Sequence, residues 1–110
     1  MAIQSTQARA SRESARERFQ RLAAEWKGKS RHLSNTAQMA ILDPYQRIIG
    51  MGWDAVPLIL EELQREPDQW FWALEKITDE SPVPPEAAGR VRLMAQAWIE
   101  WGQRLGIIAP

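Results

Sequence analysis

The chain has 110 residues, of which 45% are hydrophobic and 25% charged, a composition typical of one globular domain with a single core. It contains no cysteine, which excludes disulfide bonds, thiolate nucleophiles and cysteine-ligated zinc. Its apolar runs are only a few residues long and residues 5–20 are strongly polar, so we predict neither a membrane span nor a secretory signal and expect a cytoplasmic protein.

The formal net charge is zero, but the charges are unevenly distributed along the chain. Residues 1–32 carry a net charge of +5 and residues 33–110 carry −5. The basic residues of the first segment are Arg9, Arg12, Arg16, Arg18, Arg21, Lys27, Lys29 and Arg31. Such an asymmetry indicates either docking between parts of the fold or a charged partner.

Apolar residues recur with the helical period of 3.6 along nearly the whole chain, and no strand alternation is seen. The first helix is predicted over residues 11–25, with Gly28 ending it and residues 1–10 disordered or frayed ahead of it. Its buried stripe consists of Ala15, Phe19, Leu22 and Trp26.

Two shorter helices are predicted next. Ser34 or Asn35 is expected to cap a helix that ends at Ile41. Asp43 is expected to cap a helix that begins with a proline and ends at one of the glycines at positions 50 and 52.

The following helix is predicted from a capping Asp54 to Glu66, with Pro57 in its first turn, where the missing N–H costs no helical hydrogen bond. Glu61 and Arg65 are spaced to form an ion pair on its wet side. Its buried stripe consists of Val56, Ile59, Leu60 and Leu63.

The last third of the chain is predicted to hold two helices. One begins near Asp68 and buries Trp70, Ala73, Leu74 and Ile77. A proline-rich loop over residues 79–85 separates it from a helix over residues 85–105, which Gly106 ends. The stripe of this helix consists of Val91, Met94, Ala95, Trp98, Trp101 and Leu105. These elements predict an all-α, compact bundle of five to six helices in a single domain over residues 11–110.

Three segments of the sequence carry a resemblance to known proteins. They read D-P-Y-Q-R-I-I-G-M-G from Asp43, P-L-I-L-E-E-L from Pro57, and W-F-W-A-L-E-K-I-T from Trp70, followed by P-V-P-P. Together with W-I-E-W-G near the C-terminus, they resemble a family of small bacterial helical proteins that has no assigned activity. The resemblance implies no catalytic residue. Residues 53–77 are also similar to a HEAT-like helical hairpin, which would favour protein binding, although a solenoid needs about three such units.

The sequence offers little material for catalysis or metal binding. His32 is the only histidine, and a zinc site would need carboxylates alone to complete it. The carboxylate pairs Glu61 with Glu62 and Asp79 with Glu80 are adjacent in sequence, so we expect them to be solvated rather than to act as acid and base. We therefore predict no catalytic residue, no metal, no cofactor and no small-molecule substrate.

Six tryptophans dominate the candidate core. Trp72 is rotated about 200° from Trp70 on a helix, so the buried stripe does not place it. It either lies beneath the N-terminal helix or forms, with Leu58 and Leu93, an exposed patch that binds another chain. Trp53 is expected to pack in the core or to make a staple contact at the start of its helix, with partner binding as the alternative. Tyr45 is expected to be half-buried with its hydroxyl bonded.

The basic segment allows a second interpretation. Its glutamates are spaced to neutralise much of its charge within the helix, for example Glu17 with Arg21 and Arg21 with Glu25. The residues best placed for phosphate contact are Arg21, Lys27, Lys29 and Arg31. An amphipathic membrane-surface helix is disfavoured because the glutamates oppose anionic lipid.

The leading hypothesis is a non-catalytic helical protein-protein interaction module: a subunit, an adaptor or the neutralising partner of another bacterial protein. Its expected partner is another protein or a second copy of the chain. The alternative is a small nucleic-acid-binding regulator that uses the basic N-terminal segment.

Overall fold

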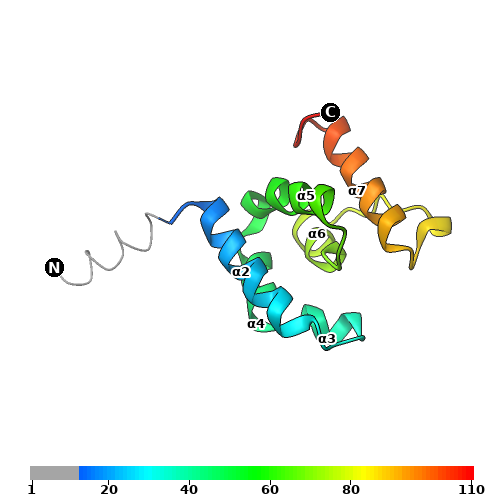
Figure 1. The fold of residues 1–110 in the computed structure, drawn as a ribbon. Coiled ribbons are helices and arrows are strands. Elements are labelled where there is room, and N and C mark those ends of the chain that lie inside the picture. Colours follow the sequence, from blue (N-terminus) through cyan, green and yellow to red (C-terminus); the bar gives the residue numbers. More distant parts are fainter. Residues whose placement is uncertain (1–12) are drawn as a thin grey trace.

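The helical period of the apolar side chains produces six α-helices and two short 3₁₀ helices, without a strand, in the part of the chain that the structure describes (Figure 1). The structure is a computed structural model that describes residues 13–110. The elements are α2 (Ala15–Ser30), α3 (Thr36–Ala40), α4 (Asp43–Gly50), η1 (Gly52–Ala55), α5 (Val56–Arg65), α6 (Phe71–Thr78), η2 (Pro85–Ala87) and α7 (Val91–Arg104). The predicted all-α bundle is confirmed. The expectations for residues 1–10, Ser11 and the charges of Arg9 and Arg12 lie outside the described residues.

Helix α2 begins with a capping box, in which the Ser14 side chain accepts from the backbone N–H of Glu17 and the Glu17 side chain accepts from that of Ser14. The helix continues through Gly28 to Ser30, so the prediction that Gly28 ends it is wrong. A glycine inside a helix costs only about 1 kcal/mol. Burial of Trp26 and Ser30 on the core side holds the last turns in place.

Asn35 caps α3 as predicted, since its side-chain oxygen accepts from the backbone of Ala37 and Gln38. The two aspartates do not act as caps. Asp43 is already inside α4, where its carboxylate pairs with Arg47 one turn later, and the capping position falls to Leu42. Asp54 lies within η1, which precedes α5 and displaces its start to Val56.

The last helix starts later than predicted. Residues 85–87 form η2, and Gly89 then adopts a left-handed conformation with φ of 80°, which breaks the helix before Val91. Gly106, with φ of 73°, lies just beyond the other end of α7, as expected.

The core is centred on an aromatic cluster contributed by distant segments. Trp26 of α2 lies 4.4 Å from Trp70 between ring centroids and 5.3 Å from Tyr45 of α4. Phe19 of α2 lies 5.6 Å from Trp70. The cluster joins α2, α4 and the start of α6, while α7 packs against α5 on the other side of the bundle (Figure 1).

Tyr45 is fully buried, so the prediction of a half-buried ring is wrong, while the prediction of a bonded hydroxyl is confirmed. The hydroxyl donates to the carbonyl of Gln69 and accepts from the backbone N–H of Ala73, each at 3.0 Å. Ala73 is the third residue of α6, whose N-terminus receives no hydrogen bond from the side chain at its own capping position. Tyr45 therefore caps α6 from a different helix.

Candidate functional site

The six tryptophans divide into four buried and two exposed rings. Trp26, Trp70, Trp98 and Trp101 are buried, whereas Trp53 is 54% exposed and Trp72 is 45% exposed. The expectation that Trp53 packs in the core is wrong, and so is the alternative that places Trp72 beneath the N-terminal helix. Two large aromatic side chains thus face solvent on different elements, η1 and α6.

Trp53 is the more exposed of the two rings. Gly52, with φ of 69°, turns the chain ahead of it, and the Trp53 ring lies against Trp101 of α7 with centroids 6.5 Å apart. Leu105, the C-terminal cap of α7, follows Trp101 by four residues, about one helical turn, and is 60% exposed. We call the exposed Trp53 and Leu105, together with the buried ring of Trp101 that Trp53 adjoins, the Trp53 surface.

The exposure of Leu105 contradicts the prediction that it belongs to the buried stripe. Its position lies just beyond the last residue of α7, and Gly106 then reverses the chain. Ile107 and Ile108 of the tail pack against the core instead. Sequence periodicity could not show this, because it cannot tell where neighbouring elements stop covering a helix.

Trp72 and the other predicted partner-binding residues do not form one patch. Trp72 lines a shallow hollow with Glu75, Lys76 and Asp79, so its surroundings are charged. Leu93 is 41% exposed and lines a different hollow beside the proline-rich loop and α7. Leu58 is only 8% exposed, and it therefore cannot belong to an exposed patch.

Leu58 lies instead at the floor of a groove of about 500 Å³ between α2 and α5, which we call the α2–α5 groove. Phe19 and Ala23 of α2 complete the apolar floor. Its walls carry charged side chains: Arg16 and Lys27 from α2 and Glu61, Glu62 and Arg65 from α5.

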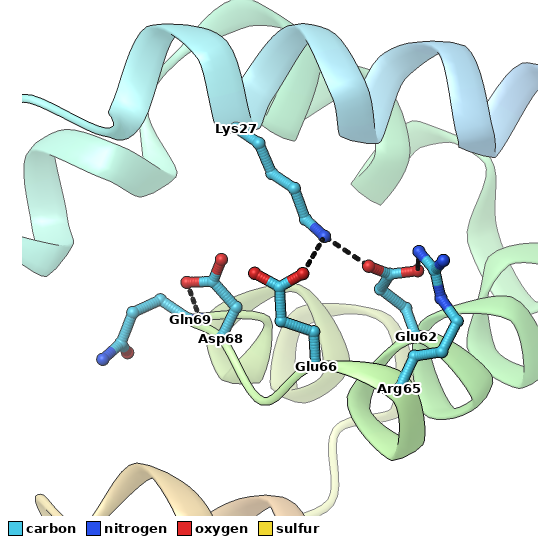
Figure 2. A network of polar contacts seen from close by, with 6 residues as sticks. All are labelled: Lys27, Glu62, Arg65, Glu66, Asp68 and Gln69. Carbon is cyan, nitrogen blue, oxygen red and sulfur yellow. Dashed lines mark hydrogen bonds and ion pairs between the residues drawn. The ribbon is translucent and has the colours of Figure 1, made fainter.

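A polar network bridges one end of this groove (Figure 2). Lys27 donates to the carboxylate of Glu62 and, at 3.5 Å, to that of Glu66. Arg65 donates to the second oxygen of Glu62 at 2.7 Å. Burial disfavours the ionised form of Glu62, but the hydrogen bonds from Lys27 and Arg65 outweigh it, so the pKa of Glu62 is lowered. The pKa of Lys27 is raised, because its bonds to Glu62 and Glu66 outweigh its burial.

The basic residues of α2 are largely matched by carboxylates. Arg21 pairs with Glu13 at 2.9 Å rather than with the predicted Glu17 or Glu25. Lys29 pairs with Glu25 at 3.2 Å. Arg31 makes no ion pair within residues 13–110.

The predicted pair of Glu61 with Arg65 is also wrong. Glu61 pairs with Arg16 of α2 at 3.0 Å, and Arg65 pairs with Glu62. Arg16 and Lys27 of the basic segment thus pair with carboxylates of α5 and its C-terminal end, so part of the charge asymmetry between the two parts of the sequence is used within the fold.

The described residues contain no group of three or more histidine, cysteine, aspartate or glutamate side chains arranged to hold a metal ion, and His32 is exposed. None of the helices in residues 13–110 has both the length and the apolarity required to cross a bilayer. Comparison of the chain with protein-family models, curated proteins and solved structures gives no significant match.

Proposed function

We propose that the chain is a non-catalytic protein-protein interaction module that binds a protein partner through the Trp53 surface. The observation that carries the proposal is the exposure of Trp53 beside the buried ring of Trp101, with Leu105 exposed about one helical turn beyond Trp101. Large exposed apolar side chains that form a patch mark interaction sites more often than single exposed residues do.

The geometry of the Trp53 surface suits an energetic hot spot. Trp101 is itself held by Trp98, whose ring meets it edge-on at 5.1 Å, so the ring beneath Trp53 is part of the core. A partner that covers Trp53 would bury an indole already supported on one face, and tryptophan is enriched among residues that dominate binding energy. Trp72 is the second candidate, but it is surrounded by charged groups that a partner would have to desolvate.

The contacts of the basic segment do not favour the alternative of a nucleic-acid-binding regulator. Arg21, Lys27 and Lys29 are each bonded to a carboxylate, so a phosphate would have to replace glutamates at three of the four predicted positions. We retain the resemblance to small bacterial helical proteins and a cytoplasmic location as parts of the same proposal, since both are compatible with a partner-binding subunit or adaptor.

The proposal is tested by affinity capture with the tagged chain from extracts of the cells that encode it. We compare the unmodified chain with Trp53→Ala and with Trp72→Ala, a matched loss of an exposed indole from a different element. The proposal predicts that Trp53→Ala loses a specific partner that Trp72→Ala retains, while both variants keep the helical circular-dichroism spectrum. Undiminished capture by Trp53→Ala would refute it.

A further inference from the structure

The α2–α5 groove has walls of opposite charge. On the α2 side the charged residues are Arg16 and Lys27, both basic. On the α5 side Glu61, Glu62 and the neighbouring Glu66 outnumber the single Arg65. The floor between them is apolar, and Ala24 stands exposed on the rim of α2.

We propose that this groove is the contact surface for a second copy of the chain. A two-fold rotation about an axis that runs along the groove places α2 of one copy over α5 of the other. The basic wall of each copy then faces the acidic wall of its partner, so the surface is self-complementary, as a symmetric dimer requires. An axis across the groove would instead set α2 over α2 and oppose like charges.

The ion pairs already present show how the walls would meet. Arg16 and Glu61 lie opposite each other within one copy, as do Lys27 and Glu62. The rotation keeps each residue at the same level along the groove but moves it to the opposite wall. Arg16 of the second copy therefore lies above Glu61 of the first. Each carboxylate therefore gains a second cation at its level, and each cation gains a second carboxylate. The short side chain of Ala24 leaves room for this approach.

This inference goes beyond the proposed function, because the groove is separate from the Trp53 surface. It is tested by sedimentation velocity over a concentration series on the unmodified chain, Ala24→Glu and Ala24→Lys. Both substitutions place a long charged side chain of similar size at an exposed helical position. Neither removes a buried group or an existing ion pair, so the monomer fold is retained.

The proposal predicts a reversible dimer for the unmodified chain. Ala24→Glu, which would face the acidic wall of the second copy, should weaken the dimer by at least about tenfold, whereas Ala24→Lys should retain it. Ala37→Glu on the exposed side of α3 is the control and should leave dimerisation unchanged. The proposal is overturned by a monomer at every concentration, by equal effects of glutamate and lysine at position 24, or by an equal effect at Ala37.

The same measurement on Trp53→Ala separates this inference from the proposed function. The groove dimer should persist in Trp53→Ala, because that residue does not line the groove. A dimer that Trp53→Ala abolishes would place self-association on the Trp53 surface and overturn the groove as its site.

Discussion

The hydroxyl of Tyr45 on α4 lies 3.0 Å from the backbone nitrogen of Ala73 and caps α6 across the core. Removing it with Tyr45→Phe leaves the buried N–H of Ala73 and the carbonyl of Gln69 without this partner. An unsatisfied buried polar group costs about 1–3 kcal/mol, so we expect the free energy of unfolding to fall by that amount in urea denaturation. A variant as stable as the unmodified chain would show that the hydroxyl does not act as a cap.

Glu62 is expected to stabilise the fold far more than its neighbour Glu61. Glu62 is 7% exposed and accepts from both Lys27 and Arg65, whereas Glu61 makes one surface pair with Arg16. Glu62→Gln should lower the free energy of unfolding by about 1–3 kcal/mol, because it weakens charged hydrogen bonds in a buried setting. Glu61→Gln should cost less than about 1 kcal/mol, as is usual for surface pairs. Equal losses of unfolding free energy for the two variants in urea denaturation would contradict the larger role of Glu62.

The same carboxylate predicts a pH dependence of stability. The pKa of Glu62 in the folded chain lies below its ordinary value of 4.5, so its contribution is complete above that value and is lost as the pH falls through the lowered pKa. Lys27 and Arg65, which face Glu62, stay charged over this range. The difference in unfolding free energy between the unmodified chain and Glu62→Gln should therefore be constant near neutral pH and shrink in acid. If this difference in unfolding free energy instead grew on acidification, the bonds of Glu62 to Lys27 and Arg65 could not be its source.

Two helical glycines should respond in opposite ways to alanine. Gly28 in α2 has open space where a methyl group would lie, so Gly28→Ala should gain up to about 1 kcal/mol from helix propensity. A methyl group at Gly102 in α7 would come within 2.5 Å of the buried Leu60 side chain. Overpacking of this kind costs about 1–3 kcal/mol, which offsets or exceeds the gain in helix propensity that Gly102→Ala would otherwise bring. Thermal unfolding should rank Gly28→Ala above Gly102→Ala, and the reverse order would contradict the packing of α7 on α5.

The helices could be predicted from the sequence because their apolar stripes are regular, but their caps and partners depend on tertiary contacts. Asp43 and Asp54 have the residue type of a cap, yet Asp43 pairs with Arg47 and Asp54 lies inside η1. The cap of α6 comes from Tyr45, which lies 28 residues before Ala73 in the sequence. Local spacing cannot reveal a cap supplied by another helix.

The candidate surface could be predicted only in part. The angle of Trp72 on the helix places it off the buried stripe but does not show whether another helix covers it. Trp53 falls in a short turn rather than on a long stripe, so periodicity does not place it. Leu58 shows the opposite outcome: it lies off the main stripe of α5 but is buried at the floor of the α2–α5 groove. Exposure therefore depends on how α2, α5 and α7 are placed, which periodicity within one helix does not determine.

The most direct test of the proposed function is the affinity of the captured partner for the purified chain and its two tryptophan variants, measured by titration calorimetry. Truncating a hot-spot tryptophan costs at least about 2 kcal/mol, so Trp53→Ala should bind about thirtyfold more weakly or worse. Trp72→Ala should bind with nearly the affinity of the unmodified chain. Equal affinities for the unmodified chain and Trp53→Ala would contradict the assignment of the Trp53 surface as the binding site.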